Sequence, residues 1–171
     1  MRFFTSSFTV LLLSVSALAM NVGRADADAA DAASKPKPKV CDPNAKGGNL
    51  AQLQYEALAD FADLFVNQQD VLTAFNRYVP GEYKQHNPFA QQGRDFAIQF
   101  LTNGFAGGLT VTDHLTIFGG QGYGIMHYKM AGPDITWAVA DYFKFKGTCI
   151  VEHWDVLQQI TGTEPNPIAF F

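Results

Sequence analysis

The sequence predicts an α+β domain in which three N-terminal helices pack in the concavity of a curved antiparallel sheet. Two observations carry this prediction. Apolar residues recur at three- and four-residue spacing in the first part of the chain and at every second residue from about position 109, the periods of a helix and of a half-buried strand. The turns between the strand-like segments are short, and strands joined so closely must be antiparallel. Helices followed by hairpins are the order of an α+β fold.

Three segments have the helical period. Residues 50–65 place leucine, alanine and phenylalanine along one stripe, as an amphipathic helix does. Asp70 is suited to cap a second short helix over residues 71–78, which a Pro-Gly pair ends. Residues 95–101 predict a third helix, with phenylalanines facing inward and the glycine-containing stretch after it acting as a breaker.

The second half of the domain predicts four strands, because apolar and polar residues alternate between turn signals. Glycine-rich or Gly-Pro-Asp stretches separate them. No internal repeat is present. The predicted strands are residues 109–118, 123–130, 135–145 and 149–158.

The N-terminal part of the chain predicts targeting and linker segments. Residues 1–19 combine Arg2, a short apolar run and an Ala-Leu-Ala ending, the features of a cleaved secretory signal; a membrane anchor or a buried helix is the alternative. Residues 20–40 alternate Ala with Asp and then Lys with Pro, so they cannot bury an apolar face and predict a linker. The folded domain is expected over residues 41–171.

Export gives meaning to the two cysteines. In an oxidising compartment Cys41 and Cys149 are expected to form a disulfide that ties the start of the domain to the sheet. The alternative is two separate thiols, with Cys149 a small buried side chain.

Composition narrows the class of ligand. The 171-residue chain has a formal net charge of −4, and its only run of cations is the short Lys-Pro stretch, which argues against a nucleic-acid partner. Aromatic residues make up 13% of the chain. Such a content suits a core that also lines an apolar cavity.

The third predicted strand carries an acidic residue on its apolar face. Residues at odd positions from 135 to 145 are mostly apolar and include Asp141, and a buried carboxylate is costly unless it is paired or protonated. A turn centred on Asp134 would set His127 opposite Asp141. Both side chains would then lie on the inward face.

The register of the last strand depends on the turn before it. We expect a three-residue turn over residues 145–147, because it spares Lys146 a positive φ. This turn pairs Asp141 with Val151 and places His153 and Asp155 on the inward face. A two-residue turn or a bulge would flip the strand and present Glu152 and Trp154 instead.

Further candidates surround this cluster. His86 and Asn87 lie in Gln85-His86-Asn87-Pro88, an extended stretch before the third helix, and are candidates for substrate binding. His86 could instead be a turn histidine satisfied by the backbone. Trp137 and Phe143 share the inward face of the third strand and are expected to contact a ligand.

Two motifs carry a resemblance to a known family. The first is Tyr-Lys-Gln-His-Asn-Pro at residues 83–88, followed by Gly93 and Arg94; the second joins Ala-Asp-Tyr-Phe-Lys-Phe at 140–145 to Ile-Val-Glu-His-Trp-Asp-Val-Leu-Gln at 150–158. In this order and separation they resemble the SnoaL-like family, in particular the branch of predicted SnoaL-like aldol-condensation enzymes. The resemblance covers nearly all of residues 50–171.

The resemblance implies a fold and a site. The fold would be the cystatin-like α+β cone shared with ketosteroid isomerase and nuclear transport factor, with a deep pocket between helices and sheet. In SnoaL-type polyketide cyclases an Asp of the last-strand motif removes an acidic substrate proton, and on this chain that position is Asp155. The resemblance also puts Asp141 in the pocket.

The residues permit aldol-type acid–base chemistry, in which one carboxyl takes a proton alpha to a carbonyl and a donor stabilises the enolate. We expect Asp155 to be the base, Asp141 or His127 the acid, and His153 and His86 to orient the substrate oxygen. No cofactor is expected. Other readings are water activation as in epoxide hydrolases of this fold, a metal site from His86, His127, His153 and Asp155, and a secreted non-catalytic carrier of small apolar ligands.

The expected partner is a small apolar or polyketide-like carbonyl compound. Neither nucleic acid nor, after signal cleavage, a membrane is expected as a partner, and the mature protein is expected outside the cell. Ile150, Trp154 and Val156 are predicted on the outer face of the sheet, where an apolar patch would favour a homodimer.

Overall fold

The computed structural model describes residues 40–171. The predicted signal peptide, residues 1–19, and nearly all of the predicted linker, residues 20–40, lie outside the described residues. No helix within the described range is both long and apolar enough to cross a membrane.

The helical layer confirms the three predicted helices. They are α1 (Leu50–Ala62), continued by a π-helical turn η1 (Asp63–Asn67), α2 (Val71–Tyr78) and α3 (Arg94–Ala106). Asp70 caps α2 as predicted, since its carboxylate accepts a hydrogen bond of 3.1 Å from the backbone N–H of Thr73. α3 runs five residues beyond its predicted end, through Gly104, because Phe105 packs edge-on against Phe65 with ring centroids 5.4 Å apart.

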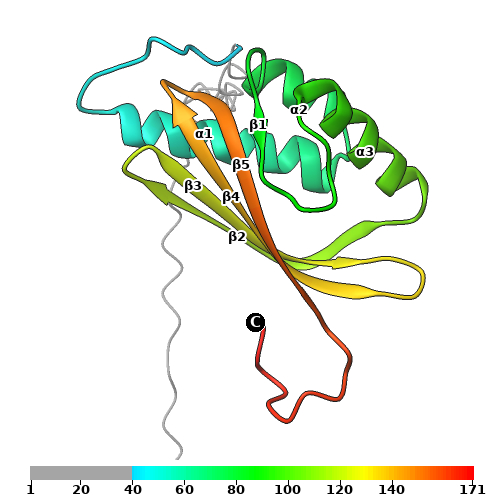
Figure 1. Ribbon diagram of the computed structural model, residues 1–171. Helices are drawn as coiled ribbons and strands as arrows, with labels where there is room; N and C mark the ends of the chain where they lie inside the picture. The colour runs from blue at the N-terminus through cyan, green and yellow to red at the C-terminus, as the bar shows by residue number, and fades with distance from the viewer. Residues whose placement is uncertain (1–39) are drawn as a thin grey trace, which may run out of the picture. The chain divides into compact units, whose positions relative to one another are not determined.

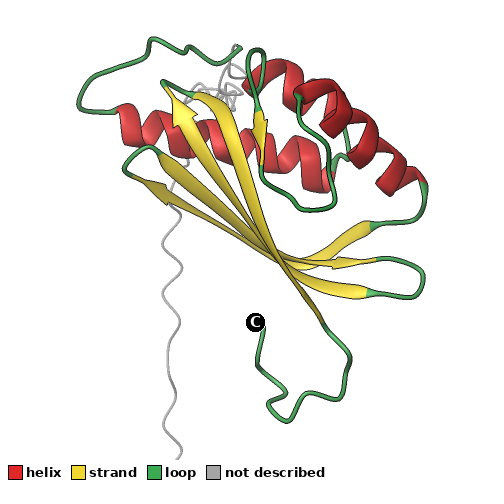
Figure 2. Ribbon diagram, viewed as in Figure 1, coloured by secondary structure: helices red, strands yellow, loops and turns green. Residues whose placement is uncertain are grey.

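The sheet has five strands in the order β1-β5-β4-β3-β2. Its four long strands are antiparallel and joined in sequence as predicted, and a short β1 adds in parallel to the edge of β5. Figures 1 and 2 show the helices lying against one face of this twisted sheet. The strands are β1 (Lys84–Gln85), β2 (Thr110–Gly120), β3 (Tyr123–Ala131), β4 (Thr136–Lys146) and β5 (Cys149–Gln159).

The core lies between the helices and the concave face of the sheet. Phe61 of α1 is buried there and meets the ring of Phe143 of β4 edge-on, with centroids 5.5 Å apart. Met126 and Val139 from the sheet and Phe75 from α2 are also buried. This arrangement is the α+β fold that the two sequence periods predict.

The β3–β4 register differs from the prediction by one residue. Met126, not His127, lies opposite Asp141, and His127 lies opposite Ala140 on the outer face. The cause is the turn, which has two central residues, Pro133 and Asp134, because Gly132 and Ile135 are still joined by a backbone hydrogen bond of 2.8 Å. Proline suits the first central position of such a turn. The prediction that His127 faces the pocket is therefore wrong.

The β4–β5 hairpin keeps the predicted inward face by a different route. Lys146 pairs with Cys149, so the turn has two residues, and Val151 is an extra residue in a bulge. Each change alone would flip the strand, because the turn moves the pairing by three residues and the bulge by one. Together they move it by four residues, an even number that keeps the predicted face beyond the bulge. Asp155 consequently lies opposite Asp141, whereas the predicted Asp141–Val151 pairing is wrong.

Before the bulge the last strand has the opposite parity. Ile150 pairs with Phe145 and is 1% exposed, so its predicted place on the outer face is wrong. Trp154 and Val156 lie beyond the bulge on the outer face, where Val156 is 70% exposed.

The predicted disulfide is confirmed. Cys41 and Cys149 are joined by an S–S bond of 2.08 Å, which ties the start of the domain to the start of β5. The adjacent turn needs glycine at position 147, because φ there is +57° and a Cβ would lie 2.1 Å from the carbonyl oxygen of Asp42.

Candidate functional site

A cavity of about 560 Å³ opens between the helices and the concave face of the sheet. This volume is that of an ordinary small-molecule site. Most of its wall is aromatic or aliphatic, and the ionisable side chains in the wall are two carboxylates, one histidine and two tyrosines. Asn87, Trp137 and Phe143 line it as predicted, with Asp141, His153 and Asp155.

Asp141 lies at the centre of a polar cluster on this apolar wall. Asp141 is buried, with 6% of its surface exposed to solvent. One carboxylate oxygen, Oδ2, accepts a hydrogen bond of 2.8 Å from the hydroxyl of Tyr128 on β3. The other, Oδ1, lies 3.1 Å from Nε2 of His153 on β5. Both oxygens are thus occupied, as a buried carboxylate requires.

His153 is held from its other side by β1. Its Nδ1 lies 2.7 Å from Oε1 of Gln85, and its ring is packed between the rings of Phe143 and Tyr83, at centroid distances of 5.0 and 6.4 Å. The parallel β1–β5 register places Gln85 beside His153. The imidazole is therefore fixed in position and orientation by β1, by β4 and by Tyr83 in the segment before β1.

Asp155 differs from Asp141 in having an unoccupied oxygen. Its Oδ2 accepts a short hydrogen bond from the side-chain amide of Asn87. Its Oδ1 is buried and has no hydrogen-bond partner among the described residues. Burial raises the pKa of Asp155 above its usual value, and the nearby charge of Asp141 adds to this; Asn87 and His153 oppose it. A carboxylate of this kind is a stronger base than an exposed one.

The two tyrosines of the cluster are neutral donors at ordinary pH. Burial, reinforced by the charge of Asp141, raises the pKa of Tyr128 and Tyr83 far above the usual value. Sequence reasoning missed Tyr128 because of the one-residue register error on β3. It missed Gln85 although this residue stands inside the first motif, since a glutamine gives no signal of its own without a known partner.

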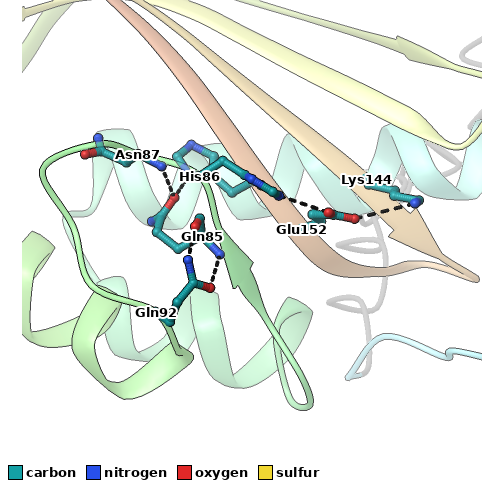
Figure 3. A network of polar contacts seen from close by, with 7 residues as sticks. Gln85, His86, Asn87, Gln92, Lys144 and Glu152 are labelled. Carbon is teal, nitrogen blue, oxygen red and sulfur yellow. Dashed lines mark hydrogen bonds and ion pairs between the residues drawn. The ribbon is translucent and has the colours of Figure 1, made fainter.

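His86 does not line the cavity. It stacks on Trp154, with centroids 4.5 Å apart and planes 3° from parallel, and its Nε2 lies 2.9 Å from Glu152. Figure 3 shows His86 directed toward Glu152 and Lys144, away from the Gln85–Gln92 pair. Placing His86 in the pocket is therefore wrong, because consecutive residues of an extended segment point to opposite faces.

His127 lies on the outer face as well, against the ring of Phe171 at a centroid distance of 4.9 Å. The same ring stacks on His114 at 4.5 Å. Neither His127 nor His86 shares a site with His153, so the metal set that combined these three histidines with Asp155 is not assembled.

A different group has metal-ligating atoms close together. Donor atoms of Asp141, His153 and Asp155 all lie within 4.8 Å of one another. These three residues could hold a divalent cation. In the structure Nε2 of His153 contacts Asp141, while Oδ1 of Asp155 has no hydrogen-bond partner among the described residues.

Comparison with known proteins supports the fold. No family model matches the chain, and no curated protein matches it. Solved structures are similar to the chain, among them three at low sequence identity. AclR, a proposed hydroxylase from Streptomyces galilaeus, has a TM-score of 0.52 at 12% identity over 63% of this chain and 90% of its own.

The other two structures align less closely. A proposed polyketide cyclase from Acidithiobacillus ferrooxidans has a TM-score of 0.49 at 16% identity, covering 62% of this chain and 88% of its own. TsrD from Streptomyces laurentii has a TM-score of 0.47 at 16% identity, covering 61% and 88%. The strand order, the helical layer and the AclR alignment agree: the chain has an α+β fold shared with AclR, in which helices cover one face of a curved sheet, and this is the architecture that its two motifs implied.

Proposed function

We propose that the protein is an acid–base enzyme of the lyase/cyclase or isomerase type, acting on a small apolar carbonyl compound by aldol-type chemistry. The observation that carries this proposal is Oδ1 of Asp155, a buried carboxylate oxygen without a partner in the wall of an apolar cavity. An unpaired buried acceptor costs about 1–3 kcal/mol. A site that retains one has an acceptor ready for a substrate hydrogen.

The proposed step uses two carboxyls in different roles. Oδ1 of Asp155 takes a proton from the carbon alpha to the substrate carbonyl, and the electrons of the broken C–H bond move into the enolate. The Asp141–His153 pair donates a hydrogen bond to the enolate oxygen. In a cyclisation the enolate carbon then attacks a second carbonyl, and the new alkoxide takes the proton from Asp155, which returns to its carboxylate form. The separation of at most 4.8 Å between the groups suits one carbonyl and its α-carbon.

The charge of the wall defines the class of substrate. No lysine or arginine in residues 40–171 lines the cavity, and Asp141 and Asp155 both do. A substrate with a carboxylate or phosphate inside the cavity would be repelled by these groups. The site therefore favours uncharged apolar ketones, in agreement with the polyketide-cyclase description of one structural neighbour.

The test uses an apolar bicyclic ketone, β-tetralone, as a probe. Wild-type protein should accelerate exchange of its α-protons for deuterium in D₂O, followed by NMR. Asp155→Asn keeps the shape and removes the base, so the exchange rate should fall by about 10²–10⁴-fold, while calorimetry shows little change in affinity.

Glu152→Gln is the matched control, because it removes a carboxylate of the same strand on the outer face and should leave exchange unchanged. Near-wild-type exchange by Asp155→Asn would contradict the proposal. Binding of β-tetralone without exchange by the wild type would instead favour the carrier function.

We also propose that the protein is exported. The Cys41–Cys149 bridge supports this, since disulfides persist in oxidising compartments. Mass spectrometry of protein recovered from the medium should find a chain that begins at Met20 or later, and recovery with an intact Met1 would contradict cleavage after Ala19.

A further inference from the structure

The side chain of Gln85 is held in one orientation by a backbone group. Its Oε1 accepts a hydrogen bond of 3.1 Å from the backbone N–H of Asn87. A backbone N–H can only donate, so the oxygen and not the amide nitrogen of Gln85 must stand at this position. The same oxygen lies 2.7 Å from Nδ1 of His153. Nδ1 must therefore carry a proton and donate it.

This orientation determines the protons on the other side of the ring. A neutral imidazole with a proton on Nδ1 has only a lone pair on Nε2. Nε2 lies 3.1 Å from Oδ1 of Asp141, which is also an acceptor. Two acceptors at this distance repel unless one of them holds a proton. The hydroxyl of Tyr128 is engaged on Oδ2 of Asp141 and does not fill this gap.

We infer that Gln85 is a positioning residue that locks His153 in the Nδ1–H form and so obliges His153 and Asp141 to share one proton between Nε2 and Oδ1. The inference rests on the proposed function in one respect: the shared proton is the one offered to the substrate oxygen, which leaves Asp155 as the sole base. With the proton on Nε2 the pair is an imidazolium and a carboxylate, and with the proton on Oδ1 it is an imidazole and a carboxylic acid.

Among the described residues, the one other carboxylate beside the pair is Asp155, whose donor atom lies within 4.8 Å of those of His153 and Asp141. Asp155 of β5 faces it across the cavity wall, Tyr128 of β3 faces it as a neutral donor, and Tyr83 lies beside the His153 ring. Phe143 of β4 covers the ring from another side. The charged residues Lys144 and Glu152 pair with each other on the outer face.

A second glutamine offers a matched control. Gln92 binds the main chain of Gln85, since its Oε1 accepts from the backbone N–H at 3.1 Å and its Nε2 donates to the backbone carbonyl. Figure 3 shows these two contacts beside the Asn87 contact. Gln92→Met therefore disturbs the same strand without removing the acceptor at Nδ1.

The test is ¹⁵N NMR of the His153 ring in the full-length, ligand-free protein. The wild type and Gln92→Met should show protonated Nδ1 together with a proton shared at Nε2. Gln85→Leu removes the acceptor at Nδ1. His153 should then change to the neutral tautomer that carries its proton on Nε2 and donates it to Asp141, and Nδ1 should lose its proton. Exchange of β-tetralone by Gln85→Leu should fall in kcat by about 10²-fold, with KM little changed.

Gln85→Glu keeps an acceptor at the same place and should keep the Nδ1–H signal, which covers the case in which Gln85→Leu does not fold. An unprotonated Nδ1 in the wild type or in Gln85→Glu, or a retained Nδ1–H in folded Gln85→Leu, would overturn the inference. The NMR result needs no activity. Failure of the inference is therefore distinct from failure of the proposed function, which Asp155→Asn tests.

Discussion

The two faces of the sheet each carry a histidine–carboxylate pair in a different environment. On the inner face His153 and Asp141 are 3.1 Å apart, with side chains 10% and 9% exposed. On the outer face His86 and Glu152 are 2.9 Å apart, with side chains 41% and 15% exposed. The geometry of the two contacts is similar. What differs is the access of water and the number of protein groups that depend on each pair.

The outer pair is open to solvent and to a third charge. Lys144 reaches Glu152 at 3.5 Å, and His86 also stacks on Trp154. The hydrogen bond from His86, followed by the charges of Lys144 and Lys84, holds the pKa of Glu152 below its usual value. Water screens such a pair. The inner pair is shielded from water. If one of its residues were removed, the groups that contact that residue would stay buried without a hydrogen-bond partner.

The largest difference should appear in stability. Asp141→Ala leaves the Tyr128 hydroxyl and Nε2 of His153 buried without a hydrogen-bond partner, and breaking a buried pair in this way costs about 3–5 kcal/mol. Glu152→Ala on the outer face should cost much less, because its partners turn to water. Urea unfolding at neutral pH compares the two. Equal losses would show that the inner pair is not the more tightly coupled one.

Sequence periods predicted the fold, whereas single-residue register decided the faces. The alternation of inward and outward side chains places Asp141 and Asp155 inward, because the face of a residue depends only on whether its position along the strand is odd or even. The prediction that His127 faces inward is wrong, because the turn has two central residues, Pro133 and Asp134, and is not centred on Asp134. The pairing of the two strands therefore differs by one residue. The inward placement of Asp155 holds although the turn is shorter than expected and a bulge occurs at Val151, because the two changes move the pairing by four residues in total and an even shift keeps the face. Such local choices depend on tertiary contacts that no periodicity records.

The second prediction separates the two faces by pH. Burial raises the folded-state pKa of Asp155, so the folded protein binds more protons than the unfolded chain between the two pKa values. Stability should therefore fall as pH rises from the unfolded pKa of about 3.9 through the higher folded value. Asp155→Asn should remove this fall.

Glu152→Gln should change the pH profile in the opposite sense. The lowered pKa of Glu152 stabilises the fold above its unfolded value, and this contribution is lost as pH falls through the folded pKa. Urea midpoints across the acid range check both variants. An unchanged profile in Asp155→Asn would mean that Asp155 is not buried as described.

The smallest effect is expected from His86. Because His86 lies outside the cavity and packs on Trp154, His86→Gln should leave the affinity for β-tetralone and its exchange rate unchanged. Calorimetry and the deuterium assay measure these. A clear loss of affinity would restore the substrate-binding role that the first motif suggested.

Other features of the site lie beyond what sequence patterns can supply. Gln85 and Tyr128 are recognised as site residues only when β1 pairs with β5 and β3 with β4. The parallel contact of a two-residue strand has no periodic signature. The motif around Gln85 and Asn87 pointed to this segment, but which of its side chains turn inward follows from the structure.

The most direct test of the account is the titration of individual carboxyls by ¹³C NMR in the ligand-free protein, with Asp155→Asn and Glu152→Gln used to identify the two signals. We expect a midpoint for Asp155 above the ordinary value of about 3.9 and a midpoint for Glu152 below the ordinary value of about 4.3. A midpoint for Asp155 at or below 3.9 would contradict its role as the poised base of an apolar cavity.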